Sequence, residues 1–344
     1  MKQVDTRIDS FTKIGDWIGT FLDTYPNGDP EFVLKIKSQH IYNPWLIEQF
    51  VLKALNLWSM RLSQASLLEV SKRYPGMAEK RQEKHVAVIP EENIPLAGMH
   101  DLTMVLLAGH HFYAKNTNHE NDLLQFITNQ LILIDPEIEQ FIHWGAFPEV
   151  IDTYLVHSKP EIDGAFISYF EKKDSLIRRR KISIGILSPN DSFDDIKQLG
   201  TDIFSFFGLS RYCVRKLFIP RSFPLNQFFE AIEEFSYLYQ YNRYANNYDY
   251  HKSVFMMDQI PFYDNGFLIL RESPELHVPV GCLYYEYYDS ENEVQERVKG
   301  METSIQEIVT NLQGFPRSVK LGKAHEYALW EYEDHKDTMQ FLLG

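Results

Sequence analysis

Residues 85–115 read HVAVIPEENIPLAGMHDLTMVLLAGHHFYAK. The stretch begins with a short run rich in β-branched residues, which favours a strand, and a loop containing proline and glycine follows. Residues 101–108 then form an apolar helical segment that Gly109 ends, and residues 112–115 predict a second strand. The order strand, loop, helix, strand is a βαβ unit, so this stretch predicts an α/β protein with a parallel sheet.

The alternation of helices and strands continues on both sides of this stretch. Residues 5–75 carry apolar side chains at helical spacing and predict a helical region. Further helices are predicted at 123–134, 194–207 and 228–241, and further strands at 153–156, 182–187, 217–220 and 283–287. No internal repeat or flexible linker interrupts the pattern, and 344 residues are enough for two lobes that share one fold.

Composition limits the classes of function. The formal net charge is −14, and the densest basic run, residues 178–181, is expected to be a solvated surface segment, so nucleic-acid binding is not expected. Aromatic residues reach 14% and are expected to lie mainly in the core. Two cysteines, a polar start and the lack of a long apolar run predict a cytoplasmic protein with no signal peptide and no membrane span.

Four blocks of sequence occur in an order that is typical of one protein family. They are residues 93–101 with Lys115, the loop and strand at 208–220, the pair 244–250 (YANNYDY) and 261–268 (PFYDNGFL), and the pair 329–332 (LWEY) and 337–343 (DTMQFLL). On these blocks the chain resembles the LuxC-type acyl-CoA reductases, which are distant relatives of the aldehyde dehydrogenases. The resemblance extends over nearly the whole chain.

The resemblance implies an aldehyde-dehydrogenase-like α/β fold with a Rossmann-type cofactor lobe and a catalytic lobe. We expect the first lobe, with the N-terminal helices, at 1–178 and the catalytic-type lobe at 179–325. Residues 326–344 are expected to return for packing or for a homodimer. The implied reaction is reduction of a fatty acyl-CoA, or an acyl-carrier thioester, to an aldehyde by NADPH through a cysteine nucleophile.

Three residues match functional positions of the family. Asn93 matches an Asn whose amide points at the oxyanion, although an Asn that forms a turn before a proline is an equal alternative. Lys115 matches a Lys on the adenosine ribose and its 2′-phosphate, which would favour NADPH, and the alternative is an ordinary exposed lysine. Glu275 has the spacing of the Glu that holds the nicotinamide ribose, with a plain surface Glu at least as good an interpretation.

The segment Val156-His157-Ser158 departs from the family, which has Thr-Gly-Ser at this strand end. A glycine there lets the cofactor pyrophosphate approach the backbone closely. His157 instead places an imidazole where the phosphate would pass. The sequence contains no His-Glu-x-x-His or Cys-x-x-Cys spacing, so no metal site is expected.

The nucleophile loop departs as well. The family reads Gly-Leu-Gly-Cys, and Gly208 and Leu209 keep the register, so Arg211 stands where the cysteine is expected. If the loop opens a helix, Cys213 is rotated by about 200° from that position, and its thiol would point away from the substrate. A buried cysteine that packs as a small apolar group is the commoner case.

Two functional hypotheses therefore remain open. One is an NADPH-dependent acyl-CoA reductase in which Cys213 or an unconventional arrangement does the chemistry. The other is a catalytically degenerate relative that binds an acyl chain or acyl-CoA, or that serves as a partner subunit. In the second case the guanidinium of Arg211 could bind a carboxylate or the phosphates of CoA.

Overall fold

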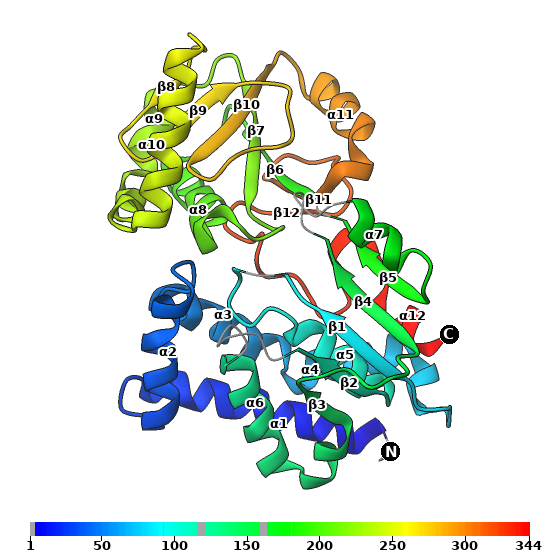
Figure 1. Cartoon of the computed structure of the whole chain (residues 1–344). Coiled ribbons are helices and arrows are strands. Elements are labelled where there is room, and N and C mark those ends of the chain that lie inside the picture. The colour runs from blue at the N-terminus through cyan, green and yellow to red at the C-terminus, as the bar shows by residue number, and fades with distance from the viewer. Residues whose placement is uncertain (1–3, 92, 116–121, 159–163, 180) are drawn as a thin grey trace. The chain divides into compact units, whose positions relative to one another are not determined.

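The computed structural model describes residues 4–91, 93–115, 122–158, 164–179 and 181–344. The chain folds as two compact units (Figure 1). The first comprises Met1–Arg180 together with Ala328–Gly344, and the second is Lys181–Tyr327. The first unit is therefore built from two separate parts of the chain, and each unit has its own sheet.

The sheet of the first unit is entirely parallel, with the strand order β3-β2-β1-β4-β5. The strands are β1 (His85–Ile89), β2 (His111–Ala114), β3 (Ile142–Trp144), β4 (Thr153–His157) and β5 (Ser175–Arg178). From β1 the sheet grows in one direction through β2 and β3, and in the other through β4 and β5. The two directions meet between β1 and β4, which makes this the topological switch point of the sheet.

Helix α5 (Met99–Ala108) connects β1 to β2, so the predicted βαβ unit at 85–115 is confirmed. Nine of its ten residues are buried, which agrees with its apolar sequence. The helix ends at Gly109, which has a φ of 92° and donates its backbone N–H to the Leu106 carbonyl. A left-handed glycine is a common helix terminator, as predicted for this position.

Other helices surround this sheet. They are α1 (Val4–Thr24), α2 (Pro30–Tyr42), α3 (Glu48–Arg61), α4 (Gln64–Arg73), α6 (Asp122–Ile134), α7 (Gly164–Phe170) and α12 (Thr338–Leu343), with 3₁₀ turns at Pro75–Ala78, Pro136–Phe141 and Glu333–His335. Helix α1 packs against α3, α4 and α6, and α12 packs against α5. The segment after residue 328 therefore completes the first unit.

The sheet of the second unit has the order β12-β11-β6-β7-β10-β9-β8 and is parallel except for the β8–β9 pair. Its strands are β6 (Ile182–Ile186), β7 (Val214–Pro220), β8 (Tyr263–Asp264), β9 (Ile269–Glu272), β10 (Cys282–Tyr288), β11 (Ile305–Thr310) and β12 (Ser318–Val319). Its helices are α8 (Phe193–Phe204), α9 (Leu225–Ala231), α10 (Asn242–Met257) and α11 (Glu291–Gly300), with 3₁₀ turns at Ser205–Gly208, Glu233–Gln240 and Glu302–Ser304.

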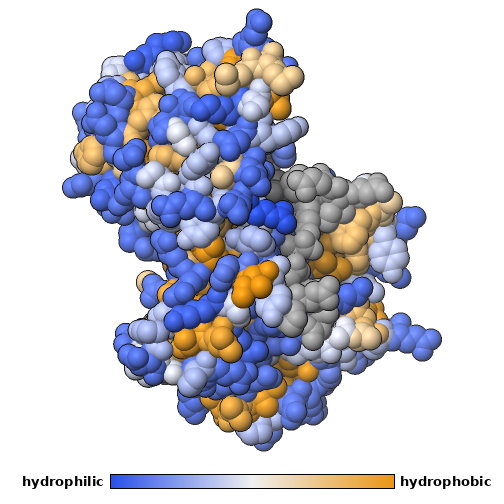
Figure 2. All heavy atoms as spheres, turned by 60° about the vertical axis from the view of Figure 1, so that its left-hand side comes forward, coloured by the Kyte–Doolittle hydropathy of each residue, from blue (hydrophilic) through white to orange (hydrophobic). Residues whose placement is uncertain are grey.

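Apolar and aromatic side chains fill the interior of each unit. In the first unit, Phe32 and Phe126 stack with ring centroids 4.5 Å apart, and Trp17 packs on both. Figure 2 shows that hydrophobic side chains form separate patches among hydrophilic ones on the face that it displays. Within the described residues, no helix is both long and apolar enough to cross a bilayer.

Candidate functional site

The carboxyl ends of β1 and β4 lie side by side at the switch point of the first sheet. The two strands pair in parallel, with Ile89 opposite Val156 (Figure 1). Glu91 follows the end of β1, and His157 is the last residue of β4. Open parallel sheets bind their ligands outside the carboxyl ends of the strands at this point, so the residues here form the candidate site.

His157 is part of a buried charged network. Its Nε2 lies 2.7 Å from Oδ2 of Asp101, a residue in the first turn of α5. The other carboxylate oxygen of Asp101 accepts a hydrogen bond of 2.8 Å from Nη1 of Arg178, the last residue of β5. Arg178 also donates to the hydroxyl of Thr338 in α12. The network thus connects helix α5 and strands β4 and β5 to helix α12, which lies in the segment after residue 328.

Arg178 corrects one expectation from the sequence. Residues 178–181 were expected to be a solvated basic segment, but the side chain of Arg178 is 1% exposed and pairs with the equally buried Asp101. Arg179, the next residue along, does have an exposed side chain and pairs with exposed Glu171. Arg178 is buried because it is the last residue of β5, and Arg179 lies beyond the end of that strand.

The electrostatics of the network follow from this pairing. Burial acts to raise the pKa of the Asp101 carboxyl, but the cations Arg178 and His157 together outweigh it and hold that pKa well below its usual value. Burial acts to lower the pKa of His157, but the Asp101 carboxylate outweighs it and raises that pKa. Asp101 is therefore a fixed negative charge between two donors. Nε2 of His157 also lies 2.6 Å from Nη1 of Arg178, so the three side chains are in mutual contact.

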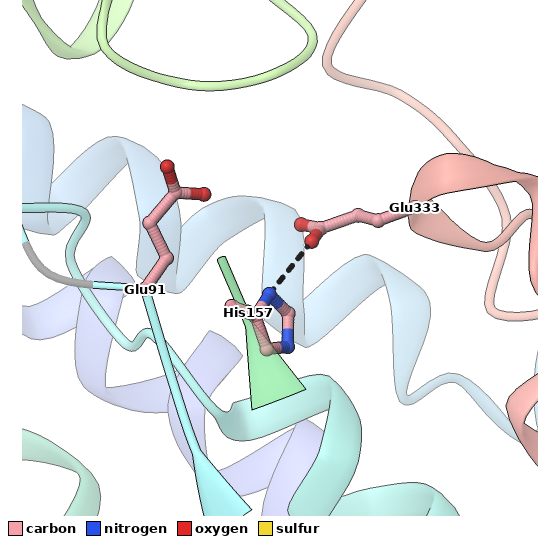
Figure 3. A group of neighbouring side chains, drawn as sticks. All are labelled: Glu91, His157 and Glu333. Atoms are coloured by element: carbon pink, nitrogen blue, oxygen red, sulfur yellow. Dashed lines mark ion pairs between the residues drawn. The ribbon is translucent and has the colours of Figure 1, made fainter. Parts of the chain in front are cut away.

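The other ring nitrogen of His157 faces two glutamates. Nδ1 lies 3.1 Å from Oε2 of Glu333, as the dashed line in Figure 3 marks, and Glu91 reaches the same place from the segment after β1. One donor atom from each of Glu91, His157 and Glu333 lies within 4.8 Å of the other two. Nδ1 is buried and makes no aligned hydrogen bond with the described residues.

A pocket of about 370 Å³ adjoins this cluster and shares Glu91 with it. Aromatic and aliphatic side chains dominate its wall, and Asn93 and Lys115 are among the polar residues there. The lining residues are Asn43, Leu46, Val88, Ile89, Pro90, Glu91, Asn93, Ile94, Ala97, Lys115, Phe147, Tyr154, Phe166, Tyr169 and Phe170. The volume is in the range of small-molecule sites.

The structure brings together two of the residues that the sequence nominated for this lobe. Oδ1 of Asn93 accepts a 3.1 Å hydrogen bond from the Asn43 amide, and the Lys115 ammonium lies 5.7 Å from the ring centroid of Phe147. Ser158, in contrast, is buried, and its backbone N–H donates to the Arg178 carbonyl at 2.9 Å, which continues the β4–β5 pairing. The roles that the resemblance implies for these residues stay predictions.

The nucleophile loop lies in the second unit and has a different shape from the one expected. Helix α8 ends at Phe204, a 3₁₀ turn covers Ser205–Gly208, and strand β7 begins at Val214. Residues 209–213 form a turn between them. The expectation that Arg211 and Cys213 lie at the start of a helix is therefore wrong, and the helical rotation between them does not apply.

Arg211 and Cys213 are both buried in this turn. The backbone carbonyl of Arg211 accepts a 2.8 Å hydrogen bond from the Ser183 hydroxyl, and its side chain is 2% exposed. The Cys213 thiol donates to the Ser205 carbonyl at 3.0 Å and lies 3.7 Å from Nε2 of His325. Cys213 is 0% exposed, so its thiol is a packed group and not an accessible nucleophile.

Glu275, the remaining nominated residue, also lies in the second unit. It has an exposed side chain, and its backbone N–H donates to the Ser273 hydroxyl at 3.2 Å. Sequence reasoning missed Glu91, Asp101, Arg178 and Glu333, which surround His157. The one available signal was Asp101, a charged residue at the start of an otherwise apolar helix.

Comparison with protein-family models and with curated protein sequences finds no match. Solved structures do match over most of the chain. One is aldehyde dehydrogenase 21 from Physcomitrella patens in complex with succinate, at 11% identity and a TM-score of 0.63, covering 100% of this chain and 84% of that one. The fold is that of the aldehyde dehydrogenases.

Two further structures have the aldehyde dehydrogenase fold in common with this chain. An NAD-dependent aldehyde dehydrogenase from Sinorhizobium meliloti matches at 10% identity and a TM-score of 0.61, covering 92% of this chain and 72% of that one. A bifunctional proline utilization A protein matches at 12% identity and a TM-score of 0.65. The match covers 90% of this chain but only 36% of the proline utilization A chain. The expected fold class is confirmed.

Proposed function

We propose that this protein binds a fatty acyl chain or acyl thioester without reducing it. The observation that carries the proposal is the state of the nucleophile loop. The resemblance implies a nucleophile at position 211, where this chain has an arginine, and the nearby thiol of Cys213 is fully buried and donates to the Ser205 carbonyl. Formation of an acyl-enzyme needs an accessible thiolate, and burial keeps this thiol out of reach of a substrate.

The pocket of the first unit supports an acyl ligand. Its wall is largely apolar, with aromatic rings from Phe147, Tyr154, Phe166 and Phe170, and the ammonium of Lys115 supplies a cation at the same pocket. An apolar chain gains free energy by leaving water, at roughly 25 cal/mol per Å² of buried apolar surface. A carboxylate or thioester head group would find its polar partners in Lys115 and Asn93.

The charges beside the pocket favour an acyl chain over a dinucleotide. Glu91 and Glu333 both lie at the switch point, where the pyrophosphate of a dinucleotide passes in open parallel sheets. Two carboxylates repel a pyrophosphate, and the imidazole of His157 occupies the space that a glycine would leave open. The same repulsion acts on the pyrophosphate of CoA, so the acyl part is the proposed ligand.

Calorimetry on chelator-treated protein tests the proposal with palmitate, palmitoyl-CoA, CoA and NADPH titrated separately. We expect heat from the two ligands that carry an acyl chain and none from CoA or NADPH. Tyr169, which lines the pocket and is 55% exposed, offers a variant with little risk to folding. Tyr169→Ala should weaken binding, whereas Tyr250→Ala, at an exposed tyrosine of the second unit, should not.

A second candidate function is NADPH-dependent reduction of an acyl-CoA. The observation that favours it is the common pocket of Asn93 and Lys115, the two residues that the resemblance links to the oxyanion and to the cofactor ribose. The decisive assay follows NADPH absorbance after addition of palmitoyl-CoA. Oxidation that Cys213→Ala abolishes would establish the reductase and refute the proposal above.

A further inference from the structure

We infer that Glu91, His157 and Glu333 form a binding site for a divalent transition-metal ion such as Zn²⁺. One donor atom from each residue lies within 4.8 Å of the others, and Nδ1 of His157 is already 3.1 Å from Oε2 of Glu333. Donor atoms around a zinc ion with bonds of about 2.0–2.2 Å lie roughly 3–4 Å apart. Small rotations of the glutamate side chains therefore bring all three donors to bonding distance.

The orientation of His157 is the second observation that points to an ion. Its Nε2 lies 2.7 Å from the Asp101 carboxylate, which Arg178 holds in turn. This leaves Nδ1 as the nitrogen directed at Glu91 and Glu333, in a side chain that is 8% exposed. Histidines that bind metal ions commonly donate their other N–H to a carboxylate, which fixes the tautomer and the direction of the ring.

The charge balance is consistent with a dication. Asp101 and Arg178 neutralise each other within the network. Glu91 and Glu333 then place two carboxylates beside Nδ1 of His157, and one M²⁺ ion would balance both charges. A proton on Nδ1 balances only one of them, so a proton and a metal ion compete for the same nitrogen.

The donor set selects the kind of ion. One imidazole nitrogen with two carboxylate oxygens suits Zn²⁺, Co²⁺ or Mn²⁺, whereas Mg²⁺ and Ca²⁺ favour oxygen ligands alone. Three protein ligands leave at least one further position on such an ion for water or a ligand. Because Glu91 also lines the acyl pocket, that position is next to the pocket.

The test uses the full chain, stripped with a chelator and titrated with Zn²⁺ by calorimetry and with Co²⁺ by visible absorbance. We expect a Co²⁺ absorption band and Zn²⁺ binding that Glu91→Gln weakens more than about tenfold, because even outer-sphere partners contribute roughly 10–100-fold. Glu91 is the first choice for mutation because it is half-buried and lies outside the Asp101 network.

A matched control removes one imidazole from a second group of histidines in the same unit. Nδ1 of His111 lies 3.2 Å from Nε2 of His143, and the rings of His85 and His111 stack 5.0 Å apart. These residues are at the other end of the sheet strands, so His111→Gln should leave the Co²⁺ band and the Zn²⁺ affinity unchanged. Circular dichroism of both variants confirms that they fold.

Two results would overturn the inference. The first is wild-type protein that gives neither a Co²⁺ band nor heat with Zn²⁺. The second is metal binding that Glu91→Gln leaves intact and His111→Gln removes. No acyl ligand is present in this experiment, so failure of the metal site and failure of the proposed acyl binding are separate outcomes.

Discussion

The end of strand β4 and the turn before strand β7 both carry residues other than those that the sequence resemblance implies, and the two regions differ in their surroundings. At the end of β4 stands His157, and four charged or titratable partners surround it. In the turn before β7 stand Arg211 and Cys213, both buried, and the thiol of Cys213 is hydrogen-bonded to a backbone carbonyl. The first region holds charged groups that face one another, and the second is part of the packed interior.

This difference shows that the two regions are held together by different kinds of interaction. Burying charges is costly unless they are paired, so the Asp101 network persists only as a complete set. A buried thiol has no such requirement, because it behaves as a small apolar group. Stability measurements should therefore distinguish the two regions. Removing one polar partner should lower the free energy of unfolding much more at the end of β4 than in the turn before β7.

The largest effect is expected from Asp101→Asn. Loss of this carboxylate removes the ion-pair partner of the buried Arg178 guanidinium and leaves His157 with Glu333 as its paired carboxylate. Removing one partner of a buried ion pair costs about 3–5 kcal/mol in the free energy of unfolding. Urea denaturation followed by circular dichroism measures this difference.

The pH dependence of the stability difference between wild type and Asp101→Asn is a control for this prediction. The folded-state pKa of Asp101 is lowered, so its contribution to stability is present above the unfolded pKa of about 3.9 and is lost as the pH falls through the folded value. The raised pKa of His157 acts in the opposite direction, since the stability from its pairing with Asp101 is present below the unfolded pKa of about 6.5 and is lost as the pH rises through the folded value. The gap between wild type and Asp101→Asn should therefore be largest in mildly acidic solution, shrink above neutral pH as His157 loses its proton, and shrink again in strong acid. A gap that is small at neutral pH would mean that the network contributes little.

A smaller effect is expected from Thr338→Val, which removes the hydroxyl that accepts a hydrogen bond from Arg178. A buried charged donor left without its acceptor costs about 1–3 kcal/mol. The matched change at the other site is Ser183→Ala, which removes a neutral donor to the Arg211 carbonyl. If the two variants lose equal stability in parallel denaturation curves, the proposed contrast between charged and neutral sites is wrong.

Cys213→Ala should lower the free energy of unfolding by about 1–2 kcal/mol, since it removes only a buried sulfur and its weak hydrogen bond. The variant should bind acyl ligands as the wild type does, because the pocket lies in the first unit. Titration calorimetry with palmitate compares the two proteins. Loss of acyl binding in this variant would tie the thiol to the ligand and contradict the present assignment.

The least perturbing experiment is thiol modification of the native protein. Both cysteines are buried, and burial raises the pKa of Cys282 to about 12. We expect alkylation by iodoacetamide at pH 8 to proceed only as fast as the protein unfolds, with full reaction in denaturant. Rapid labelling of Cys213 in the native state, identified by mass spectrometry, would show an accessible thiol in the β7 region.

Local sequence signals predicted the framework well. The β-branched run, the apolar helix and Gly109 identified β1, α5 and β2, because their hydrophobic periodicity and turn residues are local properties. Helix α10 was not predicted, since its sequence NRYANNYDYHKSVFMM has many polar residues and few apolar ones to show the period. The helix expected at 228–241 is instead split into α9 and a 3₁₀ turn.

The candidate site could be predicted only in part. His157 was singled out because it replaces a glycine, but its partners Glu91, Asp101 and Glu333 come from three segments that only the tertiary fold brings together. Arg178 was assigned to the surface because charge runs usually are solvated, and its pairing with Asp101 depends on the order of the strands. The residue spacing at 209–213 is compatible with a helix start as well as with the turn that is found, so spacing alone does not distinguish the two.

The divided first unit has a consequence for how the protein folds during synthesis. Residues 328–344 supply Glu333 and Thr338, and all of the second unit is translated before them. Until they emerge from the ribosome, Arg178 lacks its hydroxyl acceptor and His157 lacks one of its glutamates. The second unit can complete its sheet first, since domains fold as units during translation. Closure of the first unit then becomes a late step, and a chain stopped before residue 328 would carry an open charged network that chaperones and proteases could recognise.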